Sequence, residues 1–254
     1  MKADLYRIFR GKAFYITLLL FLAFILLQVV TGYTESLIPT MQDRNNTPIT
    51  GATAPFEMMN NSDTTLFFLL SFIVTVAAFD FSAGTVKNVL ASGTERAQYY
   101  LAKLVLSLIF CFLISFVMVT LSSAMATMIR GFGGEFDTAF IGRVSRAFGA
   151  QLIVLFAVTC VGVFFVFVAK NVAATIALFL AFGLLPQLII AFVASFNENL
   201  TFLFNFDLWG NAVRLVNVDL MKASDIVLAL LSGTFYIAVS TIGGIMLFEK
   251  SEVK

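Results

Sequence analysis

Residues 79–103, FDFSAGTVKNVLASGTERAQYYLAK, form a polar segment between two long apolar runs of the chain. The segment carries three basic residues and two glycines. Between the glycines, Val86, Val89 and Leu90 follow the i, i+3, i+4 spacing of an amphipathic helix. We therefore expect a short helix parallel to a membrane surface, joining two membrane-spanning helices.

The composition of the whole chain explains why a membrane is expected. Hydrophobic residues make up 60% of the 254 residues, charged residues only 12%, and there are 30 Phe. Soluble domains carry a charged fraction of about 25%. Apolar runs of roughly 17 to 25 residues, long enough to cross a bilayer, recur along the chain. The sequence predicts an all-α polytopic membrane protein in which residues 1–254 form a single domain.

Six membrane-spanning helices account for the apolar runs. The fourth and fifth are separated only by Lys170-Asn171, because residues 148–195 are far too long for one span and a tight turn is required. The expected spans are residues 13–31, 64–80, 104–128, 148–169, 172–195 and 226–248.

Two flanking segments are expected at the membrane surface. In residues 1–12, Leu5, Ile8 and Phe9 share one helical stripe, which suits a short amphipathic helix in the headgroup layer; the alternative is a simple basic flank. Residues 197–225 mix aromatic and charged side chains and predict short half-buried helices before the last span. Trp209 is expected there as an interfacial anchor.

The start of the third span has its own local signals. Ser92 and Glu95 have the spacing of a capping box. Tyr99 and Tyr100 are expected in the aromatic belt of the membrane interface. Lys103 is expected to extend its ammonium group to the headgroups while its methylene stem lies in the apolar layer.

The distribution of basic residues predicts the orientation. With six spans, both termini lie on one side of the membrane. Ten Lys and Arg fall on that side and six on the other. Because basic residues favour the cytoplasmic side, we expect both termini in the cytoplasm.

A pattern in residues 79–103 resembles a known family. The order is acidic–aromatic–x–x–Gly–Thr–x–basic–x–x–Leu, then Gly–x–x–Arg, then aromatic–x–x–x–basic. Its positions are Asp80, Phe81, Gly84, Thr85, Lys87, Leu90, Gly93, Arg96, Tyr99 and Lys103. This resembles the loop between the second and third spans of ABC transporter permeases of the type-2, export class, which more often have Glu where Asp80 stands. The six-span layout is also similar to theirs.

The resemblance implies a mechanism and partners. Such permeases pair, as a homodimer or with a paralogous permease, and two copies of a cytoplasmic ABC ATPase subunit bind beneath them. ATP and Mg would belong to those ATPase subunits, and this chain would hold no cofactor. Residues 84–92 would be the coupling helix that moves with the ATPase. The coupling residues implied are Asp80, Phe81, Gly84, Thr85, Lys87, Val89, Leu90, Gly93, Arg96 and Lys170.

The resemblance also implies a substrate and a location. Small six-span members often export amphipathic or antimicrobial peptides across a bacterial plasma membrane, as secretion or self-immunity, while others move drugs, lipids or ions. The alternative from the residues alone is an ordinary inner loop with basic charge, in an ATP-independent channel or secondary carrier. The expected span interiors lack Asp, Glu, Lys and Arg, which disfavours a carrier, since carriers use such groups as ion sites.

Absent motifs argue against an enzyme. The Gly11-Lys12 pair lacks the upstream glycine and following Ser or Thr of a Walker A motif, so ATP hydrolysis is expected on a separate chain. The chain has no His, and we expect no catalytic site and no metal site. Cys111 and Cys160 fall in apolar runs and are expected to be core residues. A net charge of +1 gives no indication of nucleic-acid binding.

A few small or polar residues in the spans have two interpretations. Gln28, Gln151 and Gln187 are candidates for a substrate pathway, but a lone amide in a span more often hydrogen-bonds between helices. Alanines 173, 177 and 181 form a small-residue stripe that favours close helix packing, either within the subunit or at a dimer seam.

Overall fold

The computed structural model describes residue 6 and residues 8–35, 49–196 and 198–251. All regular structure in these ranges is helical. In chain order the elements are α2 (Lys12–Glu35), α3 (Ala54–Asn60), α4 (Ser62–Ile73), a π-helical turn η2 (Val74–Ala78), α5 (Phe79–Ser82), α6 (Thr85–Ala91), α7 (Arg96–Arg130), α8 (Thr138–Ala169), α9 (Val172–Phe196), the 3-10 helix η3 (Glu198–Phe206), α10 (Leu208–Arg214), the 3-10 helix η4 (Leu215–Leu220) and α11 (Ala223–Lys250).

The described residues contain six helical stretches that are long and apolar enough to cross a membrane, which confirms the all-α polytopic fold. They are Phe14–Thr31, Ser62–Ser82, Arg96–Arg130, Thr138–Ala169, Val172–Phe196 and Ala223–Lys250. The second of these is continuous through α4, η2 and α5. Six spans at the expected places follow directly from hydropathy, since length and composition define which segments lipid tolerates.

The helices that contain the third and fourth spans extend beyond the apolar runs. α7 starts at Arg96, before the expected span at residue 104, and α8 at Thr138, before the expected span at residue 148. Arg143 and Arg146 therefore lie in a helix and not in a loop. α8 starts early because Asp137 caps it, accepting a hydrogen bond of 2.7 Å from the backbone N–H of Phe140. Hydropathy locates only the hydrocarbon layer, whereas these helices continue past it.

The turn between α8 and α9 has the expected tight form. Lys170 ends α8 with a left-handed backbone (φ 51°), the conformation of a helix C-cap. Asn171 starts α9, because its side-chain oxygen accepts hydrogen bonds from the backbone N–H groups of Ala173 (2.8 Å) and Ala174 (3.3 Å). Two residues thus reverse the chain.

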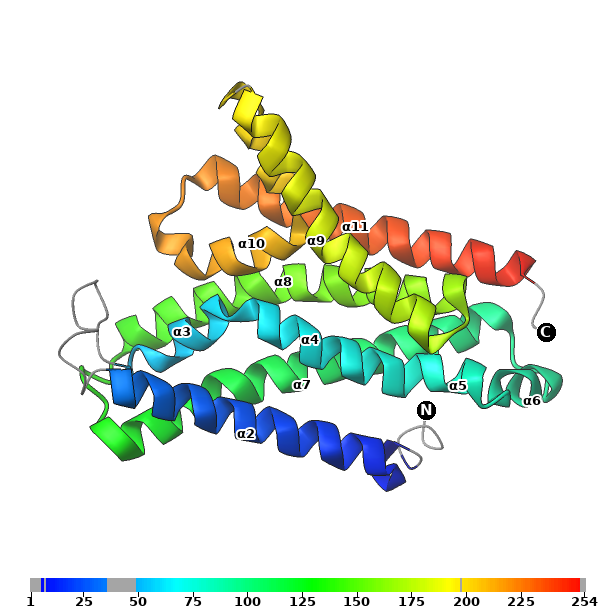
Figure 1. Cartoon of the computed structure of the whole chain (residues 1–254), viewed down its shortest axis with the longest axis horizontal. Helices are drawn as coiled ribbons and strands as arrows, with labels where there is room; N and C mark the ends of the chain where they lie inside the picture. Colours follow the sequence, from blue (N-terminus) through cyan, green and yellow to red (C-terminus); the bar gives the residue numbers. More distant parts are fainter. Residues whose placement is uncertain (1–5, 7, 36–48, 197, 252–254) are drawn as a thin grey trace.

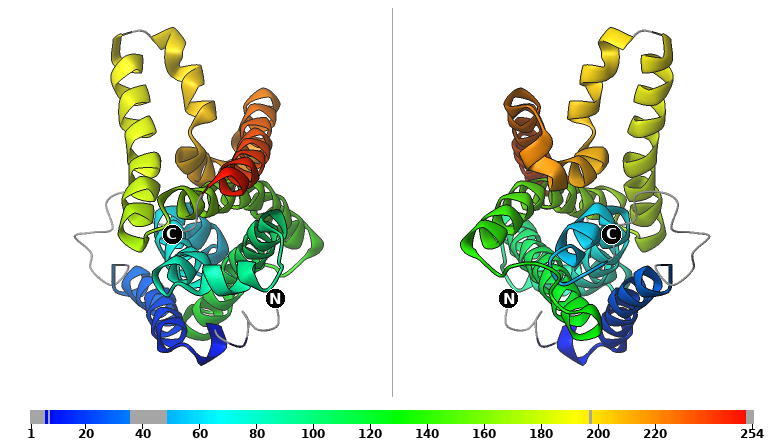
Figure 2. Two further views of the ribbon diagram at one scale, coloured as in Figure 1. Left: turned by 90° about the vertical axis from the view of Figure 1, so that its right-hand side faces the viewer. Right: turned by 90° about the vertical axis from the view of Figure 1, so that its left-hand side faces the viewer.

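The helices form a long bundle with one projecting arm. α2, α4, α7 and α8 run along the length of the molecule, and α6 lies at the opposite end of the bundle from the α7–α8 connection (Figure 1). α8 is the most central helix: its residues Val154, Val158 and Val166 are fully buried in the main core. α9 projects away from the bundle (Figures 1 and 2), and only Thr175, Phe179 and Gly183 of α9 are buried.

The structure tests the expectations for the alanine stripe on α9 and for Trp209. Ala173 and Ala177 are exposed and Ala181 is half-buried, so the first two residues of the small-residue stripe do not pack within this subunit. The short helices η3, α10 and η4 precede the last span as expected, but Trp209 is buried and not an exposed anchor at the interface. Its ring fills the space beside Gly183, and its indole N–H donates to Asp63.

The N-terminal surface helix is described only in part. Tyr6 and residues 8–10 are helical, and Ile8 packs in a core cluster with residues of α2 and α7. Lys2, Leu5 and Arg7 lie outside the described residues, so the amphipathic helix over residues 1–12 stays a prediction.

Candidate functional site

The segment that resembles a coupling loop folds into the short helix α6, Thr85–Ala91. Gly84 precedes it and Gly93 follows it, with φ angles of +66° and +92°. These left-handed backbones are easy for glycine and costly for other residues. The glycines therefore let the chain turn sharply on both sides of α6, which confirms the predicted short helix.

The orientation of α6 differs from the predicted one. Val86 is buried, with 1% of its surface exposed, and Leu90 packs against the same core. Val89 is exposed together with Lys87 and Asn88. Val86, Val89 and Leu90 therefore do not form one face. Val86 and Leu90, one helical turn apart, pack against the core of the protein and anchor α6, whereas Val89 points away from that core. The free face of α6 is Lys87, Asn88 and Val89.

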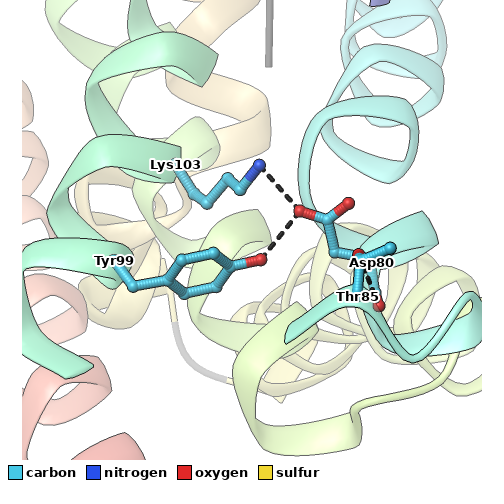
Figure 3. A network of polar contacts seen from close by, with 4 residues as sticks. All are labelled: Asp80, Thr85, Tyr99 and Lys103. Atoms are coloured by element: carbon cyan, nitrogen blue, oxygen red, sulfur yellow. Dashed lines mark hydrogen bonds and ion pairs between the residues drawn. The ribbon is translucent and has the colours of Figure 1, made fainter. Parts of the chain in front are cut away.

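A buried polar network fixes α6 to the spans on both sides (Figure 3). Asp80, in α5, accepts a hydrogen bond of 2.7 Å from the hydroxyl of Tyr99 and lies 2.7 Å from the ammonium nitrogen of Lys103, both in α7. The backbone carbonyl of Asp80 accepts a hydrogen bond of 3.2 Å from the hydroxyl of Thr85, the first residue of α6. The network thus links α5 and the first residue of α6 to two residues of α7, Tyr99 and Lys103, that lie one turn apart.

The positions of Tyr99, Tyr100 and Lys103 correct three expectations. The Lys103 side chain is 1% exposed and pairs with Asp80 instead of extending to the headgroups. Tyr99 and Tyr100 are buried, not in an exposed aromatic belt. The structure therefore pairs two ionisable groups near the ends of two spanning helices, Asp80 at the end of the second and Lys103 near the start of the third. A buried charge requires a partner of opposite charge, and here Asp80 and Lys103 neutralise each other.

Ser92 and Glu95 do not form a capping box. Glu95 is the residue before α7 but caps it with no side-chain hydrogen bond, and the Ser92 hydroxyl donates back to the carbonyl of Val89 (2.7 Å). Glu95 instead accepts from the amide of Gln98 (3.0 Å). The spacing was right for a helix start, but Gly93 turns the chain so that Ser92 belongs to the end of α6.

Arg96 joins this segment to the far end of the chain. Its guanidinium donates to the backbone carbonyls of Phe248 (3.3 Å), Glu249 (2.8 Å) and Ser251 (2.6 Å). These carbonyls belong to the end of α11, where the last turn of any helix has carbonyl groups without an intrahelical partner. Arg96 thus caps the sixth span from the first residue of the third.

Aromatic packing reinforces the same junction. The ring of Phe248, in α11, packs on Phe167 of α8 (centroids 4.8 Å), Tyr99 (6.1 Å) and Phe81 (6.3 Å). One turn along, Tyr100 donates to the carbonyl of Ser240 (3.1 Å) and lies against Gly244, where a Cβ atom would collide with its ring. The motif residues Asp80, Phe81, Arg96 and Tyr99 therefore meet at one junction of α5, α7, α8 and α11.

A comparison of the sequence with family models and with characterised proteins finds no match. The function therefore has to be argued from the residues and their geometry.

The junction joins α5, α7, α8 and α11 through buried side-chain contacts. Among the described residues no group of three or more His, Cys, Asp or Glu is placed to hold a metal ion. One oxygen of the Asp80 carboxylate, Oδ2, makes both the Tyr99 and the Lys103 contacts. Lys170, predicted as a second contact, is the turn residue between α8 and α9. This turn lies at the same end of the bundle as α6 (Figure 1).

The three glutamines considered for a substrate pathway lie in different environments. Gln151 is buried, and its amide donates to the carbonyls of Met59 (2.8 Å) and Ala212 (2.7 Å), so it ties α8 to α3 and α10. That is the interhelical role, and it leaves the amide nitrogen no free hydrogen. Gln187 is exposed on α9 and Gln28 is half-buried on α2. The three do not converge on one site.

Sequence reasoning missed two contacts of this junction. The Asp80–Lys103 pair was signalled only by two opposite charges at the ends of neighbouring apolar runs. The Arg96 cap on α11 joins residues about 150 positions apart, and no local pattern marks such a contact.

Proposed function

We propose that this chain is the membrane-spanning subunit of an ATP-driven exporter, and that α6 receives the motion of a separate cytoplasmic ATPase subunit. The observation that carries the proposal is the division of α6 into two faces. One face is anchored by Val86 and Leu90, and the other presents Lys87, Asn88 and Val89. A seven-residue helix of this kind is exposed enough to bind a partner and held firmly enough to transmit force.

The contacts that anchor α6 indicate which spans would move when an ATPase pushes on it. The Asp80 network connects α6 to the second and third spans, and Arg96 connects the same junction to the sixth. In the proposed mechanism, closure of two ATPase subunits on ATP pushes α6 and tilts these three spans together. ATP and Mg stay on the ATPase, and two permease copies form the pathway.

The proposed substrate is an amphipathic or antimicrobial peptide leaving a bacterial cell, with drugs, lipids and ions as the alternatives. Support comes from the character of the spans, which are apolar and rich in Phe. The buried Asp80–Lys103 pair is the observation that favours the alternative carrier function, because ionisable groups in spans often serve as ion sites. The pair lies beside α6 at the end of the bundle, and not at its middle, which fits a structural link better (Figures 1 and 3).

The test uses the free face of α6. The chain is co-expressed with an ABC ATPase subunit that lacks spans of its own, from the same organism. We expect the double variant Lys87→Glu, Val89→Asp to lose co-purification of the ATPase and its ATP hydrolysis. The matched control is Glu135→Lys, Phe136→Asp, which changes one charge and one exposed apolar residue at the other end of the bundle. Equal ATPase recovery with both variants refutes the coupling role of α6.

A second measurement separates the exporter from the carrier. Vesicles containing the chain and the ATPase are given ATP, a fluorescent cationic amphipathic peptide and no ion gradient. ATP-dependent peptide movement supports the proposal. Movement that follows a proton or sodium gradient and ignores ATP assigns the chain to the carriers.

A further inference from the structure

A small cavity lies inside the bundle, where α3, α4, α7 and α8 meet. Its volume is about 10 Å³, roughly the space that one water molecule needs. A volume this small excludes any ligand much larger than water. The residues that line the cavity are buried, and they include Met58, Met59, Thr65, Ser115, Met118 and Gln151.

Three of the lining side chains carry oxygen atoms. Gln151, on α8, donates both hydrogens of its amide nitrogen, to the carbonyls of Met59 (2.8 Å) and Ala212 (2.7 Å). Its side-chain oxygen is therefore the atom with which it can bind a ligand in the cavity. Thr65, on α4, and Ser115, on α7, each contribute a hydroxyl group. A hydroxyl oxygen has two lone pairs, so it can accept a hydrogen bond while it donates another.

Both hydroxyl groups lie beside sulfur atoms. Thr65 donates to the thioether sulfur of Met118 (3.1 Å), and Ser115 is in hydrogen-bond contact with the thiol of Cys111. Sulfur is a weak acceptor, so these contacts satisfy a buried hydroxyl group poorly. A ligand that is both a strong donor and a strong acceptor would therefore be stabilised between the oxygen atoms of Thr65, Ser115 and Gln151.

We propose that the cavity binds one ordered water molecule. The water donates to the side-chain oxygen of Gln151 and to the hydroxyl oxygen of Thr65, and it accepts from the hydroxyl group of Ser115. Buried waters make about three hydrogen bonds to polar groups, which is what these three side chains supply. Gln151 already ties α8 to α3 and α10, so the water extends the same polar contact to α4 and α7.

The site is tested by radiolytic footprinting of the full chain. A short X-ray pulse makes hydroxyl radicals from water, and a bound water oxidises the side chains beside it even where they are buried. Methionine is a sensitive reporter, because its thioether is readily oxidised to the sulfoxide. The purified protein is irradiated in detergent micelles with increasing concentrations of free arginine, which quenches radicals in the bulk solvent. Methionine sulfoxides are then quantified by mass spectrometry.

The expected result is a contrast between buried and exposed methionines. Oxidation of Met58 and Met118 should resist quenching by arginine, whereas oxidation of Met128, which is 87% exposed, should be quenched. Met58 and Met118 that stay unoxidised would overturn the proposal, and so would oxidation of these two residues that arginine quenches.

A matched pair of variants separates the polar contact from the shape of the cavity. Thr65→Val replaces the hydroxyl group by a methyl group of similar size, and Thr175→Val makes the same change at a buried position on α9. Arginine-resistant oxidation of Met58 should fall about tenfold in Thr65→Val, the factor for about 1.4 kcal/mol of water binding, and stay unchanged in Thr175→Val. If Thr65→Val is not monodisperse, Ser115→Ala takes its place. Retained oxidation in a folded variant refutes the site.

A further readout distinguishes the water from a soft metal ion, which methionine thioethers can also bind. The chain with Cys111→Ala and Cys160→Ala is titrated with Ag(I) and followed by native mass spectrometry. We expect no stoichiometric binding and unchanged oxidation of Met58. One Ag(I) per chain that protects Met58 and Met118 from oxidation would assign the cavity to a metal ion and overturn the proposal. None of these measurements requires ATP or an ATPase, so their failure is separate from failure of the proposed function.

Discussion

The carboxylate of Asp80 lies 2.7 Å from the ammonium nitrogen of Lys103, and their side chains are only 3% and 1% exposed. The two residues stand at the end of the second span and near the start of the third, with the whole of α6 between them. Their pairing closes this loop at its base. The pair therefore holds the ends of the two spans together beside α6.

The contributions of Asp80 and Lys103 to the free energy of unfolding should be strongly coupled. Lys103→Met removes the cation beside a buried carboxylate, and we expect a loss of about 3–5 kcal/mol. Asp80→Asn with Lys103→Met removes both charges and should lose much less than the two single changes together. The measurement is a double-mutant cycle on unfolding in mixed micelles. Strictly additive losses would show that the pair is not coupled.

The Arg96 cap should control the end of the sixth span. Arg96→Gln removes the guanidinium that binds three carbonyls, so the last turn of α11 should fray and exchange its amide hydrogens about tenfold faster. Hydrogen-exchange mass spectrometry of residues 245–251 measures this. Arg143→Gln, at an exposed position on α8, is the control. Unchanged exchange in Arg96→Gln would contradict the cap.

Two glycine substitutions should have opposite signs. Neither Gly84 nor Gly149 has an atom within 4 Å of a new Cβ, so only the backbone decides. Gly84→Ala forces alanine into a left-handed conformation and should cost about 1–2 kcal/mol. Gly149→Ala lies inside α8 and should add about 0.5–1 kcal/mol of stability. Thermal unfolding of the two variants compares them; stabilisation by Gly84→Ala would contradict the positive φ.

Gln151 and Gln187 should behave differently. Gln151→Leu leaves the carbonyls of Met59 and Ala212 without their donor, which should cost about 1–3 kcal/mol. Gln187→Leu, on an exposed position, should change stability by less than about 0.5 kcal/mol. Unfolding is measured beside peptide transport. Normal stability with lost transport in Gln151→Leu would restore its role as a pathway residue.

The orientation of the chain is tested by labelling. Asn88 on α6 and Glu135 in the α7–α8 connection are exposed at opposite ends of the bundle (Figure 1). In a chain with Cys111→Ala and Cys160→Ala, single cysteines at these positions meet an impermeant maleimide. We expect labelling of Glu135→Cys in intact cells, and of Asn88→Cys only after permeabilisation. Labelling of both in intact cells would overturn the six-span orientation.

The sequence alone predicted the parts of this protein that depend on which solvent each residue meets. A run of apolar residues defines a span wherever it stands, so all six spans were found. Gly84 and Gly93 marked the ends of α6, because a glycine between helices signals a sharp turn. The two-residue turn at Lys170-Asn171 followed from length, since no helix that long fits one bilayer crossing.

Only the tertiary structure decided which side chains meet. Lys103 was expected at the headgroups, because a lysine near a span end usually reaches water, but helix packing placed Asp80 beside it. Leu90 faces inward and Val89 outward. In so short a helix, contact with the neighbouring core determines which side chains are buried, and the spacing of apolar residues alone does not. Helix packing also brings Arg96 to the carbonyl groups at the end of α11, some 150 residues away in the sequence. Local patterns record the environment of a residue, whereas contacts between distant residues depend on how rigid helices pack together.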